Sequence, residues 1–240
     1  MPIDPDALAS SVASLAELSA AQSGLEPALE LVIDETKRLF AVDGAGLMLL
    51  TEGGVLRYAV ASDERGRLLE TMQEQVGEGP CLDAFEQSEP VVAADVTADS
   101  RWPSLGQLAG PYHLHGVLGV PVSLEDAPIG TLNVYSTQPH AWDDTEVEAI
   151  QAFGRIVVSV LRTAVEAHVQ GRIAEQLQYA LDHRVVIEQA KGVLMEREGV
   201  DPRGAFELLR GRARANRERV VELATRVIAG ESLERPASPH

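Results

Sequence analysis

The sequence predicts an α+β protein with an N-terminal antiparallel sheet and flanking helices, a long connecting helix (a coiled coil), and a C-terminal three-helix module. Three observations lead to this prediction. Short apolar runs bounded by glycines alternate with helical patterns between Leu25 and Ser136. A helical pattern then runs without a strand from Asp144. Finally, most of the basic residues of this acidic chain lie after residue 171.

The first elements are helices and a hairpin. Leu and Val recur at helical spacing from Asp6 to Ala20, and a second helix is expected from about Leu25 to Phe40. Two apolar runs, Ala45–Thr51 and Val55–Ala61, flank a Glu-Gly-Gly turn and therefore predict a β-hairpin. The charged segment Asp63–Gln75 follows with a helical pattern.

The next elements complete the sheet. A glycine-rich loop precedes a short helix at Cys81–Gln87, and Pro90–Ala94 is expected to be a short strand. Pro103–Ala109 is expected to be helical. The runs Gly116–Leu124 and Ile129–Ser136 predict a second hairpin.

A long apolar stripe follows from Asp144. Its members alternate at steps of three and four, a period typical of coiled coils. They are Ile150, Phe153, Val157, Val160, Ala164, Ala167, Gly171, Ala174, Gln178, Leu181 and Val185. The part from Ile150 to Val160 can equally pack on the sheet. Beyond Ala164 we expect no sheet to be left that could cover the stripe, so we expect a partner helix from a second copy of the chain, and hence a homodimer.

The C-terminal module has clear helix boundaries. Gly199 is placed to end the first helix, and Asp201 followed by Pro202 is a strong start signal for the second. Asn216 is the expected N-cap of the third helix. Because isolated helices of this length are marginal in water, the three must pack on one another.

Charge is distributed unevenly along the chain. The net charge is −17, with 8 basic and 26 acidic side chains in residues 1–171 but 11 basic and 9 acidic in residues 172–230. Phosphate contacts are made by Lys and Arg, so the acidic part is not expected to bind nucleic acid. The C-terminal module could bind it if its basic residues share a face.

Arginines are concentrated in one run of this module. Arg210, Arg214 and Arg217 share a face if the second helix persists that far, and the run Arg210–Arg219 contains five arginines and one acid. Arg suits bidentate phosphate contacts, although an ordinary solvated helix surface has the same pattern. Lys191, between Ala and Gly, either approaches a phosphate backbone closely or snorkels in a groove between helices.

The C-terminal residues also follow an ordered pattern. The pattern consists of Arg184, Ile187, Glu188-Gln189-Ala190-Lys191-Gly192, Leu194-Met195, Ala205-Phe206, Leu209-Arg210, Ala213, Asn216 and Ala224. It resembles the ANTAR domain, the RNA-binding module of bacterial transcription antitermination regulators. The resemblance implies a dimer that recognises paired stem-loops in nascent transcripts. By position, Arg184, Lys191 and Arg210 would contact RNA, while Gln189 and Met195 would pack.

The N-terminal part has a looser set of motifs. These are Gly79-Pro80-Cys81-Leu82-Asp83-Ala84, Pro90-Val91, Asp95-Val96, Arg101-Trp102-Pro103, Gly119-Val120-Pro121-Val122 and Gly130-Thr131-Leu132-Asn133-Val134-Tyr135. They resemble a GAF domain, a small-molecule sensor, and the whole chain resembles actinobacterial GAF–ANTAR regulators. The cyclic-nucleotide signature of some GAF domains is absent, so the ligand and its binding residues stay unassigned.

These readings divide the chain into five parts. We expect an N-terminal helical segment (1–22), a GAF sensor domain (23–165), a coiled-coil connector (166–176), an ANTAR RNA-binding domain (177–230) and a disordered tail (231–240). The expected function is ligand-responsive antitermination through stem-loop RNA. The alternative is a dimeric sensor whose Arg-rich helix docks an acidic protein partner.

Other chemistry finds little support in the sequence. There is no P-loop and no paired-cysteine zinc motif. His113 and His115 lack a third metal ligand, and Cys81, the single cysteine, is expected to be a half-buried packing residue at a helix start. We therefore expect no catalytic residue, metal or cofactor, and no enzyme.

Two further features bear on location. One cysteine allows no intramolecular disulfide, which fits a reducing compartment. No apolar run approaches the roughly 18–20 residues that span a bilayer, and the N-terminus has acids where a secretory signal has bases. We expect a cytoplasmic protein without a membrane partner.

Overall fold

The computed structural model describes residues 25–51, 55–124, 127–166, 171–216 and 218–230. The predicted N-terminal helical segment and the C-terminal tail lie outside these residues. Among the helices that the structure describes, none has the length and apolar character needed to cross a membrane.

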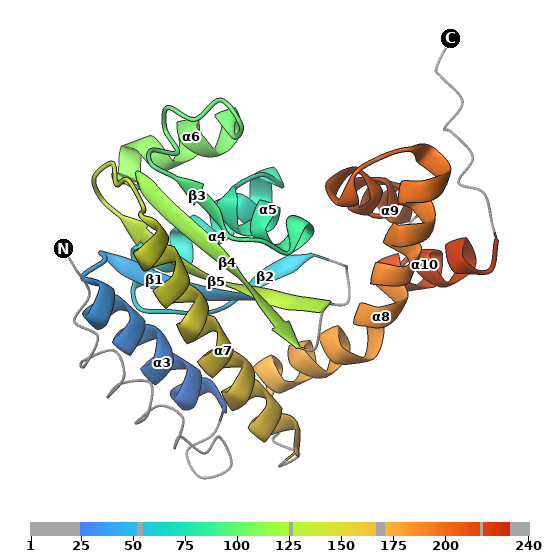
Figure 1. Cartoon of the computed structure of the whole chain (residues 1–240), viewed down its shortest axis with the longest axis horizontal. Coiled ribbons are helices and arrows are strands. Elements are labelled where there is room, and N and C mark those ends of the chain that lie inside the picture. The colour runs from blue at the N-terminus through green and yellow to red at the C-terminus, as the bar shows by residue number, and fades with distance from the viewer. Residues whose placement is uncertain (1–24, 52–54, 125–126, 167–170, 217, 231–240) are drawn as a thin grey trace.

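A five-stranded antiparallel sheet forms the centre of the N-terminal domain (Figure 1). Its order is β2-β1-β5-β4-β3. The strands are β1 (Gly44–Leu50), β2 (Leu56–Ala61), β3 (Val91–Ala93), β4 (Gly116–Leu124) and β5 (Ala127–Ser136). Both predicted hairpins, β1–β2 and β4–β5, are confirmed.

Helices cover both faces of this sheet. α3 (Leu25–Phe40) and α7 (Asp144–Glu166) pack on each other and on one face. α4 (Glu64–Val76) and α5 (Pro80–Gln87) pack on the other face. Further along the chain, α6 (Pro103–Ala109) packs on α4 and leads into a 3-10 turn at Gly110–Tyr112. All seven residues of β1 are buried as a result.

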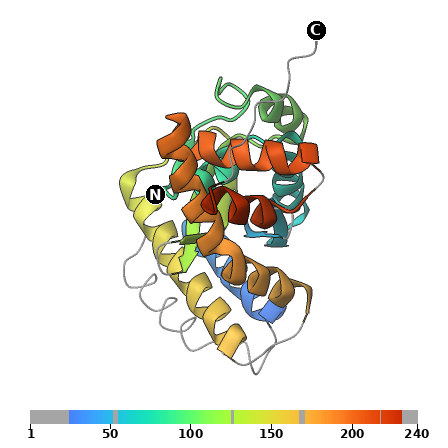
Figure 2. The same ribbon diagram turned by 90° about the vertical axis from the view of Figure 1, so that its right-hand side faces the viewer.

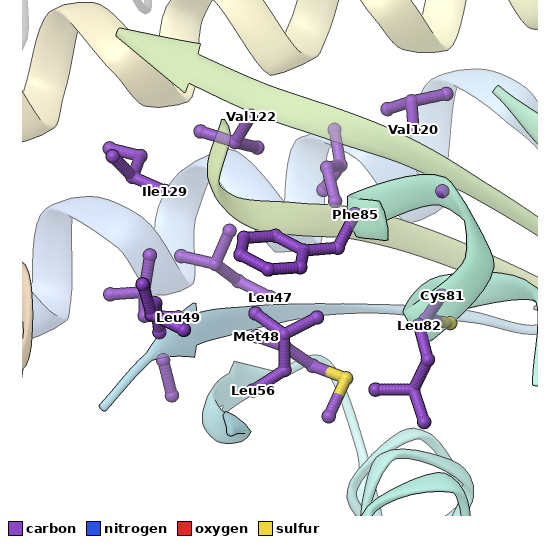
Figure 3. Close-up of a cluster of buried hydrophobic side chains, with 14 of the residues drawn as sticks. Leu47, Met48, Leu49, Leu56, Cys81, Leu82, Phe85, Val120, Val122 and Ile129 are labelled. Atoms are coloured by element: carbon purple, nitrogen blue, oxygen red, sulfur yellow. The ribbon is translucent and has the colours of Figure 1, made fainter. Parts of the chain in front are cut away.

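The core fixes the position of α5. Figure 3 shows Leu82 and Phe85 of α5 among apolar side chains from β1, β2, β4 and β5. At Gly119 of β4 an added Cβ would lie 3.0 Å from the Cα of Cys81 and 3.1 Å from the carbonyl oxygen of Pro80. The start of α5 therefore rests directly on the strand, where only glycine leaves room.

The connecting helix is divided. α7 ends at Glu166, and α8 (Arg172–Glu198) begins after Gly171, whose φ of 132° is outside the helical range. The predicted long connecting helix is therefore divided at this glycine, because glycine adopts a backbone conformation that residues with a side chain disfavour.

The sheet covers more of the connector than expected. Ile150, Phe153, Val157 and Val160 are buried, and α7 packs on β4. α8 also packs on β1 and β5, and its Ile173 is buried within the same chain. The expectation that no sheet is left beyond Ala164 is thus wrong, whereas pairing with a second copy stays a prediction.

The C-terminal module is a three-helix unit made of the second half of α8, α9 (Pro202–Asn216) and α10 (Val220–Ile228) (Figure 2). Gly199 ends α8 with a φ of 63°, and the carboxylate of Asp201 accepts the Gly204 amide at 2.7 Å at the start of α9, as predicted. Leu194, Leu209 and Ala224 are among its buried residues.

One predicted cap is wrong. Asn216 is the last residue of α9, and Arg219 is the N-cap of α10. The Glu222 carboxylate accepts the Arg219 amide at 3.3 Å, so a glutamate of the first turn satisfies one free amide at the start of this helix. The side chain of Asn216 instead donates to Glu218 at 2.8 Å.

Candidate nucleic-acid interface

Lys191 of α8 faces the sensor domain. Its residue surface is only 4% exposed, and its Nζ lies 3.0 Å from Glu188 Oε1 and 3.4 Å from the carbonyl oxygen of Glu86 in α5. A buried ammonium needs such partners to offset its lost hydration. The sequence left two interpretations of Lys191 open, close approach to a phosphate backbone or a position in a groove between helices. The second describes this arrangement.

Arg210 of α9 also lies against the sensor domain. Its side chain is 15% exposed and pairs with Glu207 at 2.7 Å. An added Cβ at Gly77, the residue that ends α4, would lie 3.3 Å from Arg210 Nη2. The guanidinium therefore packs against the turn that leads from α4 to α5.

The remaining predicted contacts are only partly placed. The backbones of Arg184 and Arg214 lie in α8 and α9, but their side chains, and all of Arg217, are outside the part of the chain that the structure describes. The structure describes α9 as far as Asn216, so the predicted shared face with Arg217 lies outside the described residues. Of the two predicted packing residues, Met195 is half-buried, but Gln189 is exposed and that prediction is wrong.

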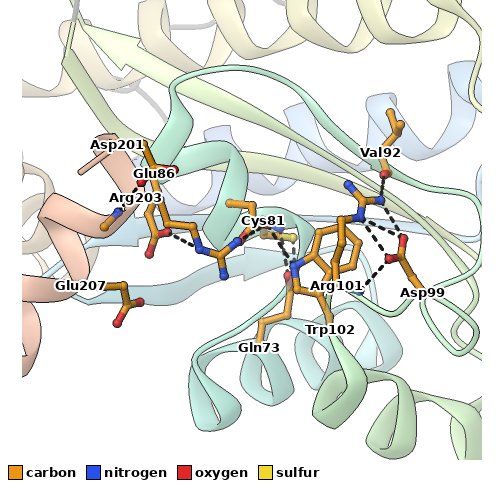
Figure 4. A network of polar contacts seen from close by, with 12 residues as sticks. Gln73, Cys81, Glu86, Val92, Asp99, Arg101, Trp102, Asp201, Arg203 and Glu207 are labelled. Atoms are coloured by element: carbon orange, nitrogen blue, oxygen red, sulfur yellow. Dashed lines mark hydrogen bonds and ion pairs between the residues drawn. The ribbon is translucent and has the colours of Figure 1, made fainter. Parts of the chain in front are cut away.

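Arg203 of α9 is a basic residue that sequence reasoning missed. Its Nη1 lies 2.8 Å from Asp83 Oδ2, and its Nε lies 3.5 Å from Glu86 Oε2. Figure 4 shows Arg203 directed toward Glu86 of α5. These partners are more than 110 positions earlier in the chain. The available sequence signal was a cation in the first helical turn, where the helix dipole favours acids.

Helix α5 supplies the opposite side of this contact. Phe85 packs edge-on against Phe206, with ring centroids 5.9 Å apart. Asp83 and Glu86 are both buried. We call this set, Asp83, Phe85 and Glu86 against Arg203 and Phe206, the α5–α9 contact.

Asp83 links the α5–α9 contact to the sensor interior. Its Oδ2 accepts the indole N–H of the buried Trp102 at 3.1 Å. The guanidinium of Arg101 lies 4.0 Å over the Trp102 ring and pairs with Asp99 at 2.7 Å. The Asp99–Arg101 pair helps to order the loop that precedes α6.

The two acids of α5 are in an environment that disfavours their charge. Burial raises the pKa of Glu86 to about 7, and repulsion from Glu207 adds to it, while Arg203 and Arg210 oppose the shift. Burial also raises the pKa of Asp83, despite the attraction of Arg203 and the Trp102 hydrogen bond. Charging either acid thus costs free energy while α5 is packed on α9.

A second buried polar cluster lies inside the sensor domain. Glu70 Oε1 accepts the amide N–H of Asn133 at 2.8 Å, and burial raises the pKa of Glu70 to about 8. Gln73 donates to the Cys81 thiol at 2.8 Å and accepts the Cys81 amide at 3.0 Å. Cys81 is fully buried at the start of α5, more deeply than predicted.

The histidines form no metal cluster among the described residues. His115 Nδ1 lies 3.0 Å from Asp95 Oδ1, which also accepts the Thr97 amide at 2.9 Å. In the described ranges no three His, Cys, Asp or Glu side chains are grouped so as to hold a metal ion.

Comparison with known proteins agrees with this architecture. The GAF domain profile matches residues 24–161, and the ANTAR domain profile matches residues 175–228. Comparison with curated proteins finds no match.

Two solved structures show the same sensor fold. One is the GAF domain of an Acinetobacter phosphoenolpyruvate-protein phosphotransferase, with 17% identity and a TM-score of 0.54 over 68% of this chain and 95% of the other. The other is the GAF domain of the Coxiella burnetii phosphotransferase of that type, with 18% identity and a TM-score of 0.53 over 68% and 96%. At these identities the likeness concerns the fold alone.

GAF and ANTAR are sensor and regulatory domains, not catalytic ones. The predicted fold class is confirmed by the sheet, its flanking helices and the C-terminal module. The chain therefore belongs to the GAF domain family and joins its GAF domain to an ANTAR domain.

Proposed function

We propose that this protein is a ligand-responsive regulator of transcription antitermination that binds stem-loop RNA through its ANTAR domain. The observation that carries the proposal is the convergence of Lys191, Arg203 and Arg210 on one side of α8 and α9, within the residues that match the ANTAR profile. Clustered Lys and Arg side chains are the electrostatic requirement for phosphate binding.

Binding requires two copies of the chain. Residues 172–230 contain only two more basic than acidic side chains, so one module alone would bind RNA weakly. A homodimer that engages two hairpins gains affinity from effective concentration without any new contact. The coiled-coil pairing of the connector belongs to this proposal.

A small-molecule ligand of the GAF domain is the proposed signal. No residue is assigned to it. Native mass spectrometry of freshly purified protein would report a retained ligand and the dimer mass in one measurement.

An acidic protein partner is the second candidate. The observation that favours it is the pairing of Arg203 with two carboxylates of a helix, because a partner helix with similarly spaced acids could bind in the same way. Such a protein would bind an acidic helical peptide but no hairpin RNA.

The deciding experiment is filter binding with an RNA of two adjacent hairpins. Affinity should fall steeply with salt, because each phosphate contact releases counterions. Lys191→Ala and Arg210→Ala should each weaken binding about tenfold. Arg155→Ala removes an exposed arginine of α7 and serves as the control. Affinity that does not change with salt, or normal binding by both variants, would contradict the proposal.

A further inference from the structure

We propose that Arg203 is a further phosphate-binding residue of the RNA interface, and that Asp83 and Glu86 of the sensor domain occupy it in RNA's place. Helix α5 and RNA would then compete for one surface. This inference rests on the proposed RNA-binding function and adds a residue and a mode of regulation to it.

The first argument is the chemistry around Arg203. Its guanidinium meets one carboxylate oxygen at 2.8 Å and a second at 3.5 Å, from residues three apart on one helix. Two carboxyl oxygens, one of them hydrogen-bonded, thus lie against one guanidinium, and phosphate oxygens can occupy the same positions. The same side chain can therefore exchange one anion for the other.

The second argument is the position of Arg203 in its helix. It follows Pro202, the first residue of α9, and the acid at this helix start is the preceding Asp201, whose carboxylate accepts the Gly204 amide at 2.7 Å. The positive end of the helix dipole repels a cation there and attracts an anion. An arginine at this position does not stabilise α9 by itself, but together with the helix end it attracts an anion.

The third argument is that α5 covers the neighbouring basic residues as well. Lys191 is 4% exposed beneath the Glu86 carbonyl, and Arg210 packs against the turn before α5. RNA cannot reach these two side chains while α5 covers them. The Arg203 side chain is 37% exposed, so RNA phosphates could first engage this residue.

The contact is suited to release. α5 has eight residues, and its two acids are buried in surroundings that disfavour their charge. A buried ion pair contributes specificity more than net stability, because desolvation offsets the attraction. RNA phosphates can therefore take the place of the two carboxyl groups on Arg203, and α9 can separate from α5 while α5 stays packed on the sheet.

Lysine acylation tests the contact directly. The chain has two lysines, Lys37 and Lys191, and the Lys37 side chain is 39% exposed, so it serves as an internal standard. Glu86→Arg places a cation beside Arg203, and Arg203→Glu places an acid beside Asp83. Each should raise the Lys191-to-Lys37 acylation ratio several-fold.

Matched controls separate repulsion from a change in net charge. Glu89→Arg alters an exposed acid just after α5, and Arg155→Glu alters an exposed arginine of α7. Neither should change the ratio. Far-UV circular dichroism of each variant checks that the helices persist. Glu86→Arg and Arg203→Glu are here called the opening variants. If both leave Lys191 as protected from acylation as in the native chain, the proposal that α5 covers the interface is overturned.

RNA binding tests the competition and the role of Arg203. Glu86→Arg should bind the two-hairpin RNA several-fold more tightly than Glu89→Arg, which carries the same charge. In the Glu86→Arg background, Arg203→Ala should weaken binding about tenfold and reduce the salt slope by about one, unlike Arg155→Ala. Unchanged binding after Arg203→Ala would overturn the phosphate role of this residue.

The outcomes distinguish this inference from the proposed function. If native and opened chains bind RNA equally while Lys191 becomes reactive, RNA binding stands and competition is wrong. If the opened variants expose Lys191 but no chain binds hairpin RNA, the proposed function fails, and the competition for RNA fails with it.

Discussion

Glu70 shows how a single buried acid couples this fold to pH. Burial raises its pKa from 4.5 to about 8, so the folded chain holds a proton that the unfolded chain releases above about pH 4.5. Its stabilising contribution is complete below that pH and is lost as the pH rises to about 8.

Glu70→Gln should therefore remove part of the pH dependence of stability. Between pH 5 and 8, urea unfolding should show the native chain losing more free energy of unfolding than the variant, at most about 1.4 kcal/mol for each pH unit. Glu78→Gln, an acid of the loop before α5, is the comparison. Parallel pH profiles for native chain and Glu70→Gln would refute the assignment.

Trp102 tests the hydrogen bond to Asp83. Trp102→Phe removes a fully buried donor to a carboxylate and should cost about 1.5–3 kcal/mol of unfolding free energy. Trp142→Phe removes a half-buried donor to the Ala93 carbonyl at 3.2 Å and should cost less, about 1 kcal/mol. Equal losses in urea titrations would mean that packing, and not the charged acceptor, dominates.

At single residues, the sequence indicates which side chains are unusual more reliably than it indicates which residues they contact in the fold. Lys191 was recognised as unusual because small residues flank it, but its burial depends on α5, more than 100 positions away. Arg203 stands outside the arginine run and was missed for the same reason. Cys81 was placed correctly at a helix start because Gly79 and Pro80 are local signals.

At the scale of elements, one glycine inside α8 and one directly after its last residue have opposite roles. Gly199 ends the helix at a φ of 63°, where Ala should cost about 1–2 kcal/mol. Gly192 lies inside the helix, is exposed, and has no atom within 4 Å of an added Cβ. Gly192→Ala should therefore stabilise by about 0.5–1 kcal/mol, because the unfolded chain loses freedom. Urea unfolding of both variants checks the opposite signs, and a shared sign would contradict this account of α8.

Elements with local signals were predicted well, and junctions were not. Both hairpins and the boundaries of α5 and α9 follow from glycine, proline and apolar spacing within a few residues. The division at Gly171 interrupts an apolar stripe whose period continues on both sides, so periodicity alone does not locate the break between α7 and α8. Asn216 has a side chain of the type that caps helices, but at the start of α10 the Glu222 carboxylate accepts the Arg219 amide instead.

At the scale of the whole molecule, the link between sensor and effector is a contact between helices distant in sequence. The domain order could be predicted because each domain has its own motifs. The α5–α9 contact could not, since Asp83 and Arg203 are individually ordinary charged residues. Trp102 and Gln73 connect α5 to the sensor interior, so a change there has a direct physical route to Arg203.

That contact should respond to pH through Glu86. The groups around it are Arg203, Glu207 and Arg210 of α9, Lys191 of α8 with its partner Glu188, and Asp83 of α5. Burial, with repulsion from Glu207, raises the pKa of Glu86 to about 7 while α5 is packed. Separation of α5 from α9 would return the pKa toward its ordinary value of 4.5 and release a proton. The packed form is therefore favoured at pH 6 and weakened as the pH rises through 7 to 8.

The Lys191-to-Lys37 acylation ratio reports this change, because Lys37 of the same chain corrects for differences in reagent activity between samples. The ratio should rise several-fold from pH 6 to pH 8 in the native chain. Glu86→Gln keeps the size of the side chain without a titrating group, so Lys191 should stay protected at both pH values. Glu89→Gln, an exposed acid three residues later, should behave as the native chain does. A ratio that falls with pH, or the same rise in Glu86→Gln, would show that another group controls the contact. Protection in Glu86→Gln alone would identify a neutral side chain at position 86 as the condition under which the sensor domain covers Lys191.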